Sequence, residues 1–176
     1  MTIYEFEGRK PVIDESSYIS ETATIIGKVT LGREVWVGPG AVIRGDYGEV
    51  FVGSYTAVEE NCVIHARPDE KTTIGEHVTL GHGSIVHTGT IRDWAVVGMA
   101  AVVSDFAVVG EWAAVGEGAV VRNKFEIPDE SIAVGIPAKV IGTVNAEYKE
   151  LWIKYKANYN SFCSRYRSLK EVGLHP

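Results

Sequence analysis

Aliphatic residues recur at every sixth position through most of this chain. The step of six begins at Ile19 and reaches Val121, with a slip of three residues after Ile43, an insertion of four after Ile64 and the loss of one after Val86. The positions are Ile19, Ile25, Leu31, Val37, Ile43, Val52, Val58, Ile64, Ile74, Leu80, Val86, Ile91, Val97, Val103, Val109, Val115 and Val121. The fifth position of each hexad is small or of modest size, and becomes uniform at Ala95, Ala101, Ala107, Ala113 and Ala119.

A period of six matches neither the α-helix nor the alternation of a half-buried strand. It is typical of a short strand and a tight corner, stacked into a parallel β-helix. The aliphatic residue fills the interior, the small residue fits the narrow corner, and three hexads complete a triangular coil. A β-sandwich would need turns at roughly 8–12-residue intervals and strands in which apolar and polar residues alternate with a period of two. We therefore predict an all-β domain over residues 1–143, which consists of a short N-terminal lead-in and a prism of about six coils.

The remaining residues, 144–176, form a second unit that packs on the prism. A helix is predicted over residues 144–172, because apolar side chains recur there at steps of three and four. This stripe consists of Leu151, Tyr155, Tyr159, Phe162, Tyr166 and Leu169. We expect it to lie along the prism, with lysines and arginines on the other faces.

Composition excludes several classes of protein. With 176 residues, 45% hydrophobic content and a net charge of −6, the chain fits one folded domain and lacks the basic face of a duplex nucleic-acid binder. No apolar run approaches the roughly 20 residues of a membrane span, and the N-terminus has no signal-peptide stretch. Cys62 and Cys163 are too far apart in sequence for a metal-binding pair, and Cys62 occupies an inward position. We expect a reduced, cytoplasmic protein without membrane partners.

Two of the five histidines stack on one corner of the predicted prism. His65 and His87 both follow the inward aliphatic residue of their hexads and are one coil apart, so their separation is about 4.8 Å. Two imidazoles at that spacing can share one zinc ion. Arg44 lies one coil before His65 and completes the column. His77 at an outward corner and His175 in the terminal tail are expected to be structural or surface residues.

His82 belongs to a different part of the coil. It lies one face earlier than His87, over the hexad that contains Glu59, and cannot readily reach the His65–His87 corner of its own chain. It can reach that corner in a neighbouring chain across a threefold axis. This placement predicts a homotrimer with metal sites at the subunit interfaces. The alternative is that all three histidines only stabilise corners.

Three segments together resemble the gamma-class carbonic anhydrases of the hexapeptide-repeat superfamily and their relatives in carnitine and phenylacetate operons. The family pattern has an Arg-x-Asp, a Gln-Asp six residues before one His, and a Gly-His before a second. The matching segments here are Ile43–Asp46, Val58–His65 and Gly81–His87. Chain length, repeat and terminal helix also match, so the resemblance covers nearly the whole chain. It implies a left-handed β-helix.

The resemblance also implies a metal site and a reaction. Zinc, with iron or cobalt as alternatives, would be bound by His65 and His87 of one subunit and His82 of the next. Metal-bound hydroxide would attack carbon dioxide. Because His82 comes from the neighbouring subunit, this implication agrees with the trimer expected from the coil register.

Four further residues are candidates for the catalytic machinery, namely Arg44, Asp46, Glu59 and Tyr159. The resemblance implies that Arg44 pairs with a carboxylate across the interface, with Asp46 or Glu60 as the candidates. For Arg44 and Asp46, a role in trimer assembly and a direct catalytic role both stay open. Tyr159 is the nearest match to a tyrosine that family members place near the site.

The chain departs from the family pattern where protons would be handled. Glu59 occupies the position of the family's Gln, and a carboxylate there can act as a general base. Tyr47 stands where the established archaeal enzyme has a glutamate. The loop that contains Asp69 and Glu70 is short, and these two carboxylates are candidates for proton transfer or are plain surface charges.

Three other functions compete with carbonic anhydrase activity. The same metal site could hydrolyse an acyl-CoA thioester, which is also attacked by hydroxide. A metal-free hexapeptide acyltransferase would use a histidine base, but usually has a longer insertion than this chain offers. The third alternative is a non-catalytic trimeric assembly protein. The expected partners are therefore other copies of the chain and a small-molecule substrate.

Overall fold

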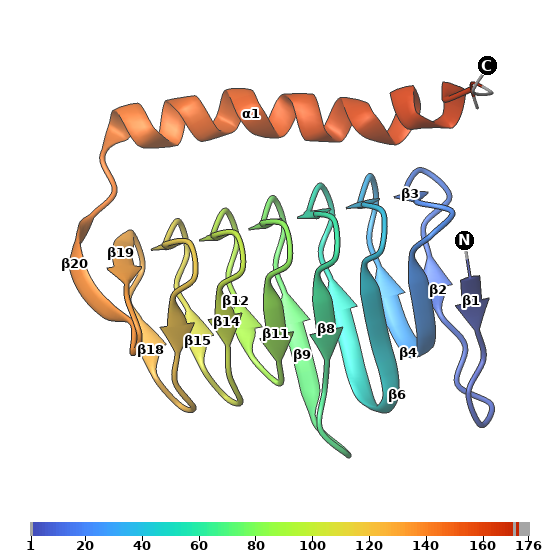
Figure 1. Cartoon of the computed structure of the whole chain (residues 1–176), viewed down its shortest axis with the longest axis horizontal. Helices are drawn as coiled ribbons and strands as arrows, with labels where there is room; N and C mark the ends of the chain where they lie inside the picture. Colours follow the sequence, from blue (N-terminus) through green and yellow to red (C-terminus); the bar gives the residue numbers. More distant parts are fainter. Residues whose placement is uncertain (1, 171, 173–176) are drawn as a thin grey trace.

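Short strands stack in parallel to form a left-handed triangular β-helix, and one α-helix runs along its length (Figure 1). The computed structural model describes residues 2–170 and 172. The strands of the first half are β1 (Thr2–Tyr4), β2 (Val12–Ile13), β3 (Tyr18–Ile19), β4 (Thr24–Leu31), β5 (Trp36–Val37), β6 (Val42–Val52), β7 (Ala57–Val58), β8 (Val63–His65), β9 (Lys71–Ile74) and β10 (Thr79–Leu80). Those of the second half are β11 (Ile85–His87), β12 (Thr90–Ile91), β13 (Val96–Val97), β14 (Val102–Val103), β15 (Val108–Val109), β16 (Ala114–Val115), β17 (Val120–Val121), β18 (Glu126–Ile127), β19 (Ser131–Val134) and β20 (Lys139–Thr143). The chain continues into α1 (Ala146–Arg165) and a 3₁₀ turn, η1 (Tyr166–Ser168).

The strands form three flat faces. The first face continues from β6 through β8, β11, β14 and β17, and the second from β6 through β9, β12, β15 and β18. These two faces count as one sheet because β4 and β6 are long enough to turn a corner and belong to both. The third face is a separate sheet that includes β3, β5, β7, β10, β13, β16 and β19.

The hexad positions line the interior as the sequence predicts. Except for Ile19, which is partly buried, every predicted inward aliphatic residue is at most 2% exposed, and the alanines at the fifth positions are fully buried. A branched side chain fits this interior because each inward residue rests on the equivalent residue of the adjacent coils. Each such valine contributes roughly 1.5–3 kcal/mol by leaving water.

The N-terminal segment is part of the prism. β1 pairs in parallel with β4 through Ile3 and Ile25. The segment that we predicted to be a lead-in therefore begins the stack of coils. The solenoid therefore has about seven turns and not six. At the other end, β20 adds an antiparallel strand to β19, a pairing the hexad pattern did not predict.

The helix differs from its prediction in length and in buried face. It begins after Asn145, whose side chain accepts a hydrogen bond from the Tyr148 backbone N–H at 2.8 Å, and ends at Arg165 and not at Val172. It runs back along the prism and contacts β3 and β5 (Figure 1).

The apolar stripe of the helix was predicted partly on the wrong face. Leu151 and Tyr155 are 45% and 47% exposed, whereas Lys156 and Cys163 are buried. Tyr159, Phe162 and Tyr166 do pack, against a cluster that contains Trp36, Ala57 and Cys163. The spacing of apolar residues predicted the wrong face because the side chain that is buried against the prism at the middle of the helix is a lysine, Lys156.

Replacing an inward valine with a charged residue tests the coil register. We expect Val109→Lys to prevent folding, because it places an ammonium group in the interior with no partner. The matched control is Val108→Lys, whose side chain points outward beside Glu126 on the adjacent coil. Circular dichroism and soluble yield compare the two proteins, and a native-like Val109→Lys protein would contradict this register.

Candidate metal centre

The predicted column of surface residues is present on one corner of the prism. β6 and β8 pair Arg44 with His65, and β8 and β11 pair His65 with His87. Because the strands are parallel and in register, the three side chains project from the same place on consecutive coils. The spacing of hexads along the sequence was therefore enough to predict this column.

The two stacked histidines face each other through ring nitrogens. His65 Nδ1 lies 3.2 Å from His87 Nε2, with the ring centroids 5.2 Å apart. Each outer nitrogen meets a carboxylate. His65 Nε2 lies 2.9 Å from Asp46 Oδ1, and His87 Nδ1 lies 2.5 Å from Asp105 Oδ1.

Both carboxylates are ionised at neutral pH. The Arg67 guanidinium, which donates to Asp105 at 2.7 Å, lowers the pKa of this carboxyl to about 2, with a further contribution from His87. Burial raises the pKa of Asp46, but the hydrogen bond with His65 and the charge of Arg44 outweigh it, and the pKa lies below its ordinary value. Both carboxylates therefore act only as acceptors.

Whether the two inner nitrogens can share a hydrogen bond depends on the tautomers of the two imidazoles. If each outer nitrogen donates its proton to a carboxylate, each neutral imidazole has a lone pair on its inner nitrogen. Two lone pairs 3.2 Å apart repel unless a proton or a metal cation lies between them. Burial lowers the pKa of His65, which disfavours the extra proton. The corner therefore suits a cation.

The geometry also fits a tetrahedral metal. Two nitrogens that are each about 2.0–2.1 Å from one tetrahedral zinc lie about 3.3 Å apart, close to the separation of the inner nitrogens. Metal-binding histidines usually donate their other nitrogen to a carboxylate, as Asp46 and Asp105 allow here. Within residues 2–170 and 172, no three His, Cys, Asp or Glu side chains of one chain gather as a ligand set.

His82 lies on the turn between β10 and β11, away from the pair formed by His65 and His87. Its backbone N–H donates to Glu59 Oε2 at 3.1 Å, and its Nε2 lies 3.2 Å from the same oxygen. Its Nδ1 lies 2.5 Å from Glu60 Oε2. Since its side chain is 53% exposed, the imidazole is accessible to a neighbouring molecule.

Glu59 and Tyr159 come together beneath His82. Glu59 is 4% exposed and lies on the turn after β7. Burial raises the pKa of the Tyr159 phenol, and the nearby Glu59 raises it further. α1 thus places Tyr159 beside Glu59 and not beside the histidine pair of the same chain.

The predicted partner of Arg44 is found within one chain. Arg44 forms an ion pair with Asp46, and Asp46 in turn contacts His65. Glu60, the other predicted carboxylate, contacts His82 instead. One chain therefore contains a continuous line of charged and imidazole groups, from Arg44 through Asp46 and the histidine pair to Asp105.

The candidate proton-transfer residues share a small cavity. It measures about 370 Å³ and includes Tyr47, Asp69 and Glu70 among its lining residues. Tyr47 is 57% exposed, and its ring lies 6.4 Å from that of His65. The short loop therefore brings both carboxylates to the same side of the column as Tyr47.

Asp105 and Arg67 are site residues that the sequence reasoning missed. Both lie outside the matching motifs, and Asp105 stands one coil beyond His87. A signal was present, because Asp105 follows the inward Val103 by two positions in a largely apolar part of the repeat. Extending the column by one more coil reaches Ser104, and Asp105 is the next residue along the chain.

The other predicted histidine roles concern His77 and His175. His77 is stacked between Tyr55 and Trp94, with ring centroids 4.9 and 4.1 Å away, as expected of a structural residue. His175 lies outside the described residues.

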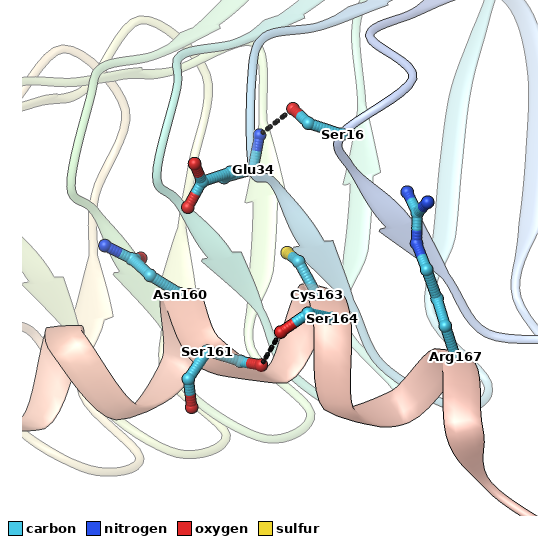
Figure 2. Close-up of a pocket in the computed structure, with 7 residues that line it drawn as sticks. All are labelled: Ser16, Glu34, Asn160, Ser161, Cys163, Ser164 and Arg167. Atoms are coloured by element: carbon cyan, nitrogen blue, oxygen red, sulfur yellow. Dashed lines mark hydrogen bonds between the residues drawn. The ribbon is translucent and has the colours of Figure 1, made fainter.

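A second cavity of about 420 Å³ lies beside the end of α1 (Figure 2). Its lining includes Glu34, Cys163 and Arg167. Burial raises the pKa of the Cys163 thiol, which makes it a poor nucleophile. Cys62 is fully buried in the prism, as predicted.

The fold and the residues stacked on its corner define a hexapeptide-repeat protein. The carnitine operon protein CaiE of Escherichia coli O157:H7 is 35% identical over 145 residues, which are 82% of this chain and 74% of CaiE. The chain belongs to the family of CaiE. No family model matches the chain.

Solved structures agree with this assignment. The product of the Bacillus cereus BC4754 gene, provisionally named an acetyltransferase, has a TM-score of 0.93 and 33% identity, over 96% of this chain and 98% of that one. A hexapeptide transferase family protein from Anaplasma phagocytophilum has a TM-score of 0.90 and 30% identity, over 94% and 98%. Perosamine N-acetyltransferase from Caulobacter crescentus, in complex with CoA and GDP-perosamine, has a TM-score of 0.63 and 27% identity, over 74% and 57%. Among the described helices, none is long and apolar enough to cross a membrane.

The charge on Asp105 should be visible in the pH dependence of stability. The folded pKa of about 2 lies below the ordinary value of 3.8, so the stabilisation is complete above about pH 4 and is lost as pH falls toward 2. We expect Asp105→Asn to lower the free energy of unfolding at pH 7 by about 2 kcal/mol.

Urea unfolding at pH 7, 5 and 3, at one protein concentration, measures this difference. The gap between the parent protein and Asp105→Asn should narrow at pH 3. A gap that stays constant from pH 7 to pH 3 would show that the charge of Asp105 does not stabilise the fold.

Proposed function

We propose that this protein is a metal-dependent enzyme with carbonic anhydrase chemistry. Zinc is the proposed ion, with iron and cobalt as alternatives, and its ligands are His65 and His87 of one subunit and His82 of the next. The main observation in support is the pair of inner imidazole nitrogens, 3.2 Å apart, whose outer nitrogens both face ionised carboxylates. The resemblance of the surrounding motifs to gamma-class carbonic anhydrases favours hydration of carbon dioxide as the reaction.

The residues of the chain have distinct roles in this proposal. When bound, the ion supplies a nucleophile from water at neutral pH. Asp46 and Asp105 fix the tautomers and orientations of the two stacked histidines. Glu59 accompanies His82 to the neighbouring subunit's site, where it occupies the position of the family's Gln.

A thioesterase that uses the same metal site is the second candidate. One observation that favours it is the carboxylate of Glu59, because a general base assists hydrolysis of a thioester. The named acyltransferases among the structural relatives, including one solved with CoA, also favour acyl-CoA chemistry on this fold. Against a metal-free transferase, the connections between consecutive strands from β7 to β19 are short, and none forms a long insertion.

The proposed assembly is a homotrimer, in which three copies provide three equivalent sites. Each site needs the corner with His65 and His87 from one copy and the turn with His82 from another. The exposure of the His82 side chain and the lack of a three-ligand set within one described chain support this arrangement. A non-catalytic trimer would keep the interface without using the metal in a reaction.

Metal content tests the ligand set. Changing His65, His82 or His87 to Ala should lower bound zinc at least about tenfold, because each supplies one of three protein ligands. His77→Ala is the control, since His77 stacks between Tyr55 and Trp94 at another corner. Elemental analysis of freshly purified trimer gives the result, and full metal in His82→Ala would disprove the two-chain site.

Mixed trimers test whether the ligands come from two subunits. We would co-express His65→Ala and His82→Ala subunits with different affinity tags and purify trimers that contain both. Each mixed trimer has one interface at which all three ligands are intact, so it should bind about one zinc against about three in the parent trimer. No recovery of zinc would place all ligands in one chain.

Glu59→Gln separates the two candidate reactions. In a carbonic anhydrase, the amide can both donate and accept a hydrogen bond, so hydration should rise several-fold while zinc stays bound. In a thioesterase, loss of the base should lower hydrolysis by about 10²-fold or more. Parallel assays of carbon dioxide hydration and acyl-CoA hydrolysis measure this, and parental rates in both would remove Glu59 from the mechanism.

A further inference from the structure

One arginine contacts the histidine pair only through a carboxylate. Arg67 lies on the short loop between β8 and β9, and its guanidinium donates to Asp105 Oδ2 at 2.7 Å. The other oxygen of the same carboxylate, Oδ1, lies 2.5 Å from His87 Nδ1. Each carboxylate oxygen therefore has its own partner, and rotation of the carboxylate would break one contact or the other.

Backbone hydrogen bonds attach both ends of this ion pair to the prism. The Arg67 N–H donates to the side chain of Thr88, which is 3% exposed, at 2.9 Å, and the Arg67 carbonyl accepts from the Glu70 N–H at 3.1 Å. The Asp105 carbonyl accepts from the Lys124 N–H at 2.9 Å. The two side chains thus meet across two coils, from backbones that are both fixed in place.

A second ion pair of the same span shows what is distinctive here. Arg92 donates to Asp129 at 3.1 Å across 37 residues, and Arg67 to Asp105 across 38. The Asp129 carboxylate also accepts from the Glu111 backbone N–H, whereas the Asp105 carboxylate meets an imidazole. Since the Arg67 side chain is 53% exposed, this arginine alone is a weak source of stability. Its distinguishing feature is the histidine on the far oxygen of its carboxylate.

We propose that Arg67 is a positioning residue for His87, which it orients through Asp105. Because both carboxylate oxygens are occupied, His87 keeps Nδ1 toward Asp105 and Nε2 toward His65. Metal-binding histidines depend on such partners of their outer nitrogen for orientation and tautomer. The use of this orientation by a metal ion rests on the proposed function, whereas the orientation itself does not need the metal.

Zinc affinity of the whole protein tests the role of Arg67. Loss of an outer partner typically weakens a metal-binding histidine site about 10–100-fold, so Arg67→Gln, one step further out, should raise the Kd for zinc at least about fivefold. Arg67→Lys keeps a positive donor and should recover most of the affinity. Arg92→Gln is the matched control and should bind zinc like the parent. Competition with a chromophoric chelator measures all four proteins, and parental affinity in Arg67→Gln would overturn the proposal.

Thermal unfolding of the metal-free proteins separates positioning from stability. Arg67→Gln and Arg92→Gln each lose one surface ion pair, so we expect both to lower Tm by at most about 4 °C. A much larger fall in Arg67→Gln alone would make Arg67 a structural residue and would contradict the proposal.

A double variant tests whether Arg67 acts through Asp105. Asp105→Asn should itself weaken zinc binding about tenfold or more. Adding Arg67→Gln should cause no further loss, because the arginine then has no carboxylate through which to act on His87. Losses that multiply would show that Arg67 affects the site by another route.

The tautomer of His87 separates this inference from the proposed function. Nitrogen-15 NMR of the metal-free protein at about pH 8, above the ordinary pKa of histidine, reports which ring nitrogen holds the proton. The parent should show the Nδ1–H form, and Arg67→Gln a mixture of both tautomers. A parent that binds no zinc counts against the proposed function, while this spectrum still decides the inference. A parental spectrum in Arg67→Gln would show that Arg67 does not orient His87.

Discussion

The in-register stacking of parallel coils is the constraint on which the rest of this structure depends. Each coil places its residues directly over those of the coil before it, at the spacing of hydrogen-bonded strands, about 4.8 Å. In the interior this stacking brings branched side chains into contact and excludes water. On the surface the same spacing places Arg44, His65 and His87 in one column. Core and candidate site are therefore products of a single repeat.

The carboxylates of Asp46 and Asp105 determine which nitrogen of each stacked imidazole donates a proton. Neutral imidazoles stacked without such partners could each donate or accept at either nitrogen and would hydrogen-bond to one another. Asp46 and Asp105 remove that freedom, because both are ionised and each accepts from an outer nitrogen. Arg44 and Arg67 in turn hold the carboxylates in the charged form. At this corner the two imidazoles are flanked by carboxylates, and the carboxylates by guanidinium groups, and the position between the imidazoles is suited to a cation.

The relatives show how many functions this scaffold supports. The family of CaiE and the named transferases share the prism, and fold alone does not choose among their reactions. The choice depends on surface residues at a few corners and on what covers them. In this chain α1 covers one face and brings Tyr159 beside Glu59. The helix is therefore part of the chemistry of the surface as well as of the stability of the prism.

The hexad pattern was sufficient for the prism and the histidine column, because a residue's place in the coil follows from counting by six. The pattern failed where residues do not obey the repeat. The first coil was missed because the spacing of β1 and β2 lies outside the step of six. The buried face of the helix was missed because Lys156, a polar residue, lies at its centre.

Contacts between distant segments were decided only by the tertiary structure. Asp105 with Arg67, and Lys156 with Val78, join residues that no common motif connects. Their partnership depends on which corner a loop or helix covers. A repeat determines positions along its own coils, whereas the packing of α1 and the choice of buried charges depend on shape and electrostatics that appear only when the coils are stacked.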